Sequence, residues 1–164
     1  MSVLTIRTFP DPVLRTPADA VGTGRRGLHR LVRDMFETLD DVGGVGLAAP
    51  QVGVGLRLFT FDVEGLRGYV IDPELRTHGE LVTEPGEGCL SVPGLHYRPE
   101  RSEEAVVTRV DAEGEPVEYR GRGLTARCFQ HEVDHLDGML FIDRLTGEDR
   151  RDSRRRLRDA AYGQ

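Results

Sequence analysis

Two histidines with a glutamate between them lie at residues 131–135, in the segment HEVDH. On an α-helix, residues i and i+4 share one face, so His131 and His135 can bind the same metal ion. Glu132 can then act as a general base on water activated by that ion, without being a ligand. The spacing therefore predicts a catalytic metal site if the segment is helical. The alternative is an amphipathic helix whose histidines are merely polar.

The flanking residues predict this helix. Two stripes at helical spacing run along the segment: Leu124, Cys128, His131 and His135 form one, and Phe129, Val133 and Leu136 form the other. The second stripe is apolar and is suited to face a core. Gly138 follows as the expected end of the helix.

A third ligand is expected because catalytic metals usually take three protein ligands and keep one position open for water. No histidine follows His135, and the residues downstream offer only carboxylates. Upstream, Cys89 stands in the glycine-rich segment EGCLS, where the backbone can approach a site closely. A thiolate with two imidazoles suits zinc or iron(II). The alternative is that Cys89 is a small buried hydrophobic residue.

The segment GVGLAAPQ, Gly44–Gln51, is too rich in small residues to predict a helix, and we expect a loop there. It lacks the Lys-Ser/Thr pair of a phosphate-binding loop. Its small residues permit a substrate strand to lie against the backbone, and Gln51 brings an amide donor. Alone, such a segment is more often a tight turn.

Together, GVGLAAPQ, EGCLS and QHEVDHLDG, in this order and at these separations, resemble the three signature motifs of peptide deformylases. The resemblance extends to Asp11–Arg15, Val92–Gly94 and Leu140–Leu145, and it covers residues 4–146. It implies a metal-dependent hydrolase that removes the N-formyl group from the first methionine of nascent polypeptides and releases formate. N-formyl-methionyl nascent peptides are thus the expected partners, in protein biosynthesis.

The resemblance also implies roles for individual residues. The metal ligands would be Cys89, His131 and His135, and Glu132 would move the proton from water to the leaving nitrogen. The side-chain amide of Gln51 and the backbone N–H of Leu90 would stabilise the oxyanion. The substrate-binding candidates are the backbone at Val45 and Gly46, which would pair with the peptide, and an apolar pocket from Val45, Leu124, Cys128 and the stem of Arg127.

The donor set does not decide the metal. The resemblance implies one divalent ion, iron(II) in the cell, with zinc or nickel in a purified sample. Two rival interpretations remain: another metal-dependent amidase or peptidase, and a non-enzymatic ribosome-associated module. Intact Glu132 and Gln51 argue against a mere binding module, which needs neither a base nor an oxyanion donor.

Composition predicts a soluble, cytoplasmic, single-domain protein of 164 residues. Two cysteines make no disulfide scaffold, and a thiolate ligand requires a reducing compartment. No signal peptide or membrane span is visible, and we expect no DNA or membrane partner. All 22 basic residues are arginine, so a lysine Schiff base is excluded.

The expected fold is α+β, with antiparallel strands packed around a central metal-binding helix, an N-terminal helix and a C-terminal helix. Apolar spacing predicts the first helix between residues 28 and 42, ended by glycines 43 and 44. Strands are expected at residues 56–63, 69–71 and 81–83, and a hairpin at 105–119. The N-terminal segment, with three prolines, is expected to be extended and to form no element.

The C-terminal residues form an arginine-rich tail. We expect residues 1–149 to form the catalytic domain and residues 150–164 to be a tail that belongs to the same domain. Six arginines against two aspartates give the tail a charge of +4. It is either a basic helix that contacts ribosomal RNA, or a solvated helix supported by its own ion pairs, since Leu157 and Ala160 promise little packing. If it contacts the ribosome, deleting it should leave activity on a short peptide intact.

Overall fold

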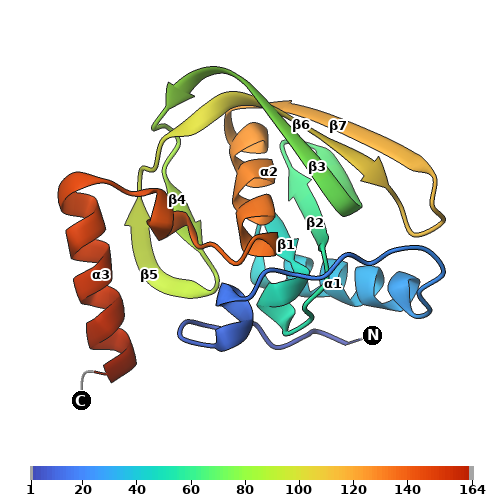
Figure 1. Cartoon of the computed structure of the whole chain (residues 1–164), viewed down its shortest axis with the longest axis horizontal. Coiled ribbons are helices and arrows are strands. Elements are labelled where there is room, and N and C mark those ends of the chain that lie inside the picture. Colours follow the sequence, from blue (N-terminus) through green and yellow to red (C-terminus); the bar gives the residue numbers. More distant parts are fainter. Residues whose placement is uncertain (1, 163–164) are drawn as a thin grey trace.

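The computed structural model describes residues 2–162 and confirms the predicted α+β class (Figure 1). An antiparallel five-stranded sheet has the order β1-β2-β3-β6-β7, and a separate two-stranded sheet pairs β4 with β5. The strands are β1 (Gly46–Ala48), β2 (Leu58–Val63), β3 (Leu66–Val82), β4 (Glu87–Cys89), β5 (Val92–Tyr97), β6 (Arg101–Val110) and β7 (Pro116–Arg122). The helices are α1 (Leu28–Val42), α2 (Gly123–Leu136) and α3 (Gly147–Tyr162), with 3-10 turns η1 (Pro12–Arg15), η2 (Ala49–Val52) and η3 (Phe141–Arg144).

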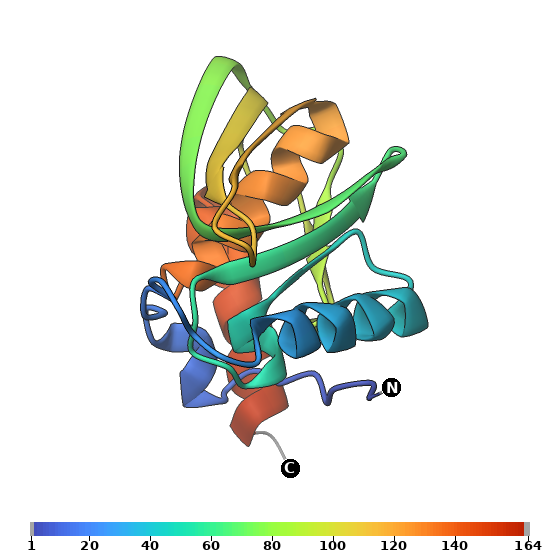
Figure 2. The same ribbon diagram turned by 90° about the vertical axis from the view of Figure 1, so that its right-hand side faces the viewer.

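Helix α2 lies at the centre and packs against the curved sheet, as Figures 1 and 2 show. Its apolar stripe is buried as expected, because Phe129, Val133 and Leu136 join the core between helix and sheet. Phe129 contacts Phe59 and Phe61 of β2, with ring centroids 6.3 Å and 5.1 Å apart. On the other stripe, His131 and His135 face Cys89 at the end of β4, whereas Cys128 belongs to the helix–sheet core.

Helix α1 spans the predicted residues and covers the β1–β2 end of the sheet (Figure 2). Leu28, Val32, Met35 and Leu39 face this second core cluster. Gly43 ends the helix at a φ of 62°, a left-handed conformation that favours glycine. The chain then turns directly into β1.

The loop predicted at Gly44–Gln51 is wrong in part. Residues 46–48 form the edge strand β1, and η2 begins at Ala49. Small residues favour no strand by themselves, and β1 exists because it pairs with β2, in the register Gly46↔Phe61. The N-terminal prediction is wrong over η1, where the Val13 N–H donates to the Asp11 carboxylate across 3.0 Å.

The two strands expected at 69–71 and 81–83 belong to one 17-residue strand, β3. Its register shifts between Ile71 and Glu74, where Asp72 has a φ of 49°. The Asp72 carboxylate there accepts hydrogen bonds from the Val21 and Gly22 N–H groups. Asp72 and Pro73 therefore lie at a β-bulge within the strand.

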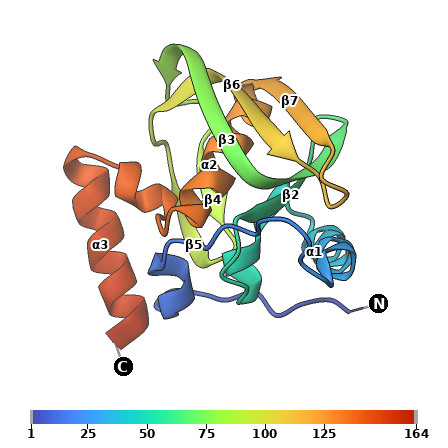
Figure 3. The ribbon, with the colours of Figure 1, turned by 45° about the vertical axis from the view of Figure 1, so that its right-hand side comes forward.

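Helix α3 stands beside β5 and η3, at one side of the molecule (Figure 3). The expectation that it packs little is wrong: Leu157 is buried in a third core cluster with Leu14, Val92 and Phe141. The tail boundary drawn at residue 150 falls inside this helix, and residues 163 and 164 lie outside the described part. No helix within residues 2–162 is long and apolar enough to cross a membrane.

Candidate metal centre and active site

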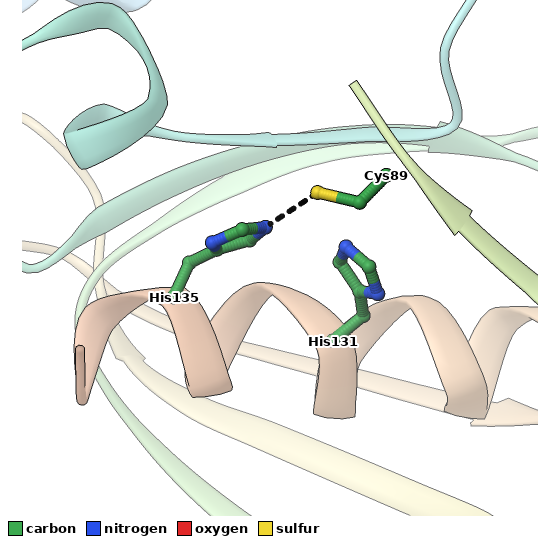
Figure 4. A group of neighbouring side chains, drawn as sticks. All are labelled: Cys89, His131 and His135. Atoms are coloured by element: carbon green, nitrogen blue, oxygen red, sulfur yellow. Dashed lines mark hydrogen bonds between the residues drawn. The ribbon is translucent and has the colours of Figure 1, made fainter. Parts of the chain in front are cut away.

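The structure brings Cys89, His131 and His135 together from two elements. Both histidines project from one face of α2, and Cys89 reaches them from the end of β4 (Figure 4). One donor atom of each lies within 4.8 Å of the other two, and Cys89 Sγ is 3.3 Å from His135 Nε2. Ligands held about 2.0–2.3 Å from one tetrahedral ion lie roughly 3.3–3.8 Å apart. A thiolate and two imidazoles at this separation fit a single zinc- or iron-type ion.

Glu87 orients the first histidine. Its Oε1 lies 2.7 Å from His131 Nδ1, and the carboxylate also accepts hydrogen bonds from Arg101 and Arg127. Burial opposes ionisation of Glu87, but Arg101 and His131 outweigh it and lower the pKa of the carboxyl. An ionised carboxylate only accepts, so His131 donates from Nδ1 and turns its Nε2 lone pair toward Cys89.

Sequence reasoning assigned no role to Glu87, although a signal was present. Residues i and i+2 of a strand point to the same face, so Glu87 and Cys89 both face α2. By contrast, His135 Nδ1 is buried without a hydrogen-bond partner in the described structure. The two imidazoles are therefore held differently: a carboxylate fixes His131 through its Nδ1, whereas His135 has its polar contact at Nε2, with Cys89.

The histidines also control the cysteine. Burial opposes ionisation of Cys89, but the adjacent His135 and His131 prevail, and the pKa of the thiol falls well below its ordinary value. Cys128, on the same stripe of α2, behaves oppositely, because burial raises the pKa of its thiol. Its Sγ lies 3.5 Å from the Val45 carbonyl oxygen. Cys89 is thus prepared to act as a thiolate and Cys128 is not.

Glu132 is buried beside the three donors. Burial raises the pKa of its carboxyl to about 7. Its Oε2 has no hydrogen-bond partner within residues 2–162, which is rare for a buried carboxylate and typical of a functional group. A base with a pKa near neutrality is suited to take and return a proton.

Gln51 presents a donor toward the cysteine. Its Oε1 accepts the Ala48 N–H across 2.9 Å, and because a backbone N–H only donates, this contact fixes the orientation of the amide. Nε2 must then face the site, 3.7 Å from Cys89 Sγ and 3.2 Å from Ser91 Oγ. Leu90 is the first residue of the tight turn from β4 to β5, where an N–H stays outside the strand pairing.

The expected substrate-binding residues line one cleft of about 490 Å³ with the catalytic candidates. Val45 and Gly46 form one wall, and Leu124, Arg127 and Cys128 of α2 form the floor. The Arg127 guanidinium binds Glu87 and the carbonyl oxygens of Val82 and Pro99, so it leaves only its stem to the cleft. His96, on β5, also lines this cleft.

The wall formed by β1 has a free edge, because β1 pairs with β2 alone among the strands of residues 2–162. The Asp62 N–H donates to the Val45 carbonyl, and hydrogen-bonding positions alternate along an antiparallel strand. The N–H and C=O of Gly46 therefore point toward the open edge. An extended peptide can add there as a further strand.

Gly46 should not tolerate a side chain. A Cβ at this position would lie 2.4 Å from Glu132 Oε1 and 2.8 Å from Cys128 Sγ, inside van der Waals contact. Gly46→Ala is expected to displace Glu132 and lower kcat by up to about 10²-fold, as a misplacement of about 1 Å can. Metal content, measured by elemental analysis, should stay normal because the three donors are untouched.

Gly55→Ala is the control for this prediction, since a Cβ at Gly55 has nothing within 4 Å. It should leave activity unchanged. Full activity in Gly46→Ala would mean that the placement of Glu132 against β1 is not needed for turnover.

The fold and the site together define a class. The metal donors are the Cys89 thiolate and the two imidazoles of the H-E-x-x-H helix, and a buried carboxylate lies beside them. This arrangement on an α+β scaffold defines a metal-dependent hydrolase. The model of the polypeptide deformylase family matches residues 3–151. The chain therefore belongs to the polypeptide deformylase family, the hydrolases that remove the N-formyl group from nascent polypeptides.

Relatives and solved structures agree. The peptide deformylase of Acidothermus cellulolyticus is 49% identical over 162 residues, which are 99% of this chain and 89% of that protein. The crystal structure of a peptide deformylase from Legionella pneumophila superposes with a TM-score of 0.86 at 41% identity, covering 98% of this chain and 96% of that one. One from Synechococcus elongatus, in complex with actinonin, has a TM-score of 0.86 at 38% identity, covering 98% and 86%.

Proposed function

We propose that this chain deformylates peptides in the cleft of about 490 Å³ that β1, β4 and α2 line, with its metal held by Cys89, His131 and His135. The observation that carries this proposal is the convergence of these three donors beside Glu132 in one cleft. When bound there, a divalent metal acts as a Lewis acid that polarises the formyl carbonyl and acidifies water.

The residues around it have separate tasks. The formyl-methionyl peptide pairs with the free edge of β1 and places its first side chain over Leu124 and Cys128. Glu132 takes a proton from the attacking water and returns it to the leaving nitrogen. The Gln51 Nε2 group and the Leu90 N–H donate to the oxyanion that develops on the formyl oxygen. Hydrogen bonds to the peptide backbone and a single pocket for the first side chain suit an enzyme that accepts many peptide sequences, because later side chains are not recognised.

The test is formate release from a formyl-Met tripeptide by anaerobically purified, iron-loaded protein. Acetyl-Met and unblocked tripeptides of the same sequence serve as matched substrates. We expect release from the formyl peptide alone. Cleavage of the acetyl or unblocked peptide would favour a different amidase or peptidase. If no peptide is turned over, the remaining interpretation is a non-enzymatic binding module.

We propose iron(II) as the metal in the cell. Thiolate and imidazole donors accept iron(II) and zinc alike, so the support is the family resemblance together with two free cysteines, which suit a reducing, cytoplasmic environment. Protein purified anaerobically from cells grown without added metal should contain iron. Zinc in stoichiometric amounts under these conditions would contradict the proposal.

We further propose that the exposed face of α3 contacts ribosomal RNA. Within the described residues, Arg150, Arg151 and Arg154 of this helix have no acidic partner, whereas Arg155 pairs with Asp152. Unpaired, exposed arginines are available to phosphates.

Deleting α3 is a poor test of this contact, because the deletion would expose the cluster that Leu157 completes. Replacing Arg150, Arg151 and Arg154 by serine should instead weaken ribosome binding, measured by co-sedimentation, and leave tripeptide deformylation unchanged. The control replaces three other exposed arginines without acidic partners in residues 2–162, namely Arg25, Arg26 and Arg76. Equal ribosome affinity in the two triple variants would contradict the proposal.

A further inference from the structure

A chain of ion pairs leads from the metal centre to the surface. His131 Nδ1 lies 2.7 Å from Glu87, and Arg101 Nε lies 2.8 Å from the other oxygen of the same carboxylate. Arg101 Nη1 continues to Asp134 at 2.6 Å. Arg144 ends the chain, with Nη2 and Nε at 2.7 Å and 3.2 Å from the two oxygens of Asp134. Four elements, β4, β6, α2 and η3, are joined in this way.

Only the last member of the chain is accessible. The side chains of Glu87, Arg101 and Asp134 are 4–5% exposed, whereas that of Arg144 is 45% exposed. Arg144 borders a second cavity of about 280 Å³, separate from the substrate cleft, together with Arg101, Asp134 and Gln130. The Arg144–Asp134 pair therefore has the most exposed side chain of this network.

The ion pair of Arg144 differs from an ordinary surface ion pair because its partner, Asp134, is buried. Exposed pairs contribute little to stability, but a buried carboxylate needs its partners to offset desolvation. Without Arg144, Arg101 would be the only cation on Asp134, and it also holds Glu87 through two of its nitrogens. Competition between the two carboxylates for Arg101 would shift its guanidinium and loosen Glu87, which would then depend more on its second guanidinium partner, Arg127.

We propose that Arg144 is a positioning residue for the metal centre: it acts through Asp134 and Arg101 on the Glu87 carboxylate that orients His131. This inference rests on the proposed metal site. Arg144 touches neither substrate nor metal ligand, and its effect reaches His131 only through the three intervening side chains.

The test measures the affinity of Arg144→Met for cobalt(II), by chelator competition, and the d–d absorption spectrum of the cobalt-loaded protein. Loss of a residue that orients a ligand directly weakens metal binding about 10- to 100-fold, so we expect about 3- to 10-fold for this more distant residue, with a shifted spectrum. Arg15→Met is the matched control. It removes an ion pair to Asp143, which adjoins Arg144 on η3, and both partners of that pair are 33–39% exposed. It should leave affinity and spectrum unchanged.

A double-variant cycle tests the route. If Arg144 acts through Asp134, adding Arg144→Met to Asp134→Asn should weaken cobalt binding no further. Losses of cobalt affinity that add in the double variant would contradict the route through Asp134. If Asp134→Asn does not fold, the inference is still tested, because identical cobalt affinity and spectra in the Arg144 and Arg15 variants would contradict it. His131→Ala separates the two proposals, because cobalt binding that is unaffected by this change would reject the metal site itself.

Discussion

Glu132→Gln is expected to lower kcat for formate release from a formyl-Met tripeptide by about 10²- to 10⁴-fold, the usual effect of losing a general base. Glutamine keeps the size of the side chain but cannot take a proton. Because Glu132 Oε2 has no partner in the described structure, no hydrogen bond there depends on its charge. The melting temperature should therefore stay the same or rise, since an unpartnered buried carboxylate opposes folding.

Metal content is the first control for this result, and it should equal that of the unaltered protein because glutamine leaves the three donors in place. Glu148→Gln repeats the same chemical change at an exposed position in the first turn of α3 and should have no effect. Turnover within about 5-fold of the unaltered enzyme, at full metal content, would exclude Glu132 as the proton carrier, given the size of a general-base effect.

Gln51→Glu is expected to lower kcat by about 10²- to 10³-fold, the effect of removing one oxyanion donor. The glutamate retains an oxygen for the Ala48 N–H, so the 3-10 turn stays intact. It replaces the Nε2 donor, which lies 3.7 Å from Cys89 Sγ, by an acceptor. KM should change far less than kcat, because the lost interaction exists mainly in the transition state.

Gln51→Met provides the comparison for this prediction. It removes the donor and the acceptor together, so it should lose similar activity and also melt at a lower temperature, because the buried Ala48 N–H loses its acceptor. A rise in KM with kcat unchanged in Gln51→Glu would assign Gln51 to ground-state binding and not to the oxyanion.

Local pattern was enough to predict helices α1 and α2, of which α2 carries the two histidines and Glu132. The apolar spacing of residues 28–42 and the two stripes of residues 124–136 depend on 3.6-residue periodicity, which is a property of the chain itself. His131 and His135 lie on the same helix, so their mutual geometry follows from the sequence as soon as the helix is accepted. The strands were harder to predict from local pattern. Residues 69–71 and 81–83 belong to one strand, β3, because that strand pairs with β6 on both sides of a bulge at Asp72.

Cys89 represents the intermediate case. Nothing local links it to His131, 42 residues later, and only its motif suggested that it joins the histidines. The structure brings the donor atoms within reach of one another, because β4 lies over the polar stripe of α2. The orientation of Gln51 likewise depends on a backbone N–H that no spacing rule would select.

Residue type and short-range periodicity were sufficient to predict a metal-dependent hydrolase, the helical pair of histidines, the adjacent base and the α+β class. The groups that hold those residues in place could be identified only from the three-dimensional arrangement. Glu87, Arg101, Asp134 and Arg144 come from four separate elements, and their pairing depends on long-range packing and burial. Leu157 shows the same limit, because an isolated apolar residue in a charged helix becomes a core residue only through the cluster that it meets.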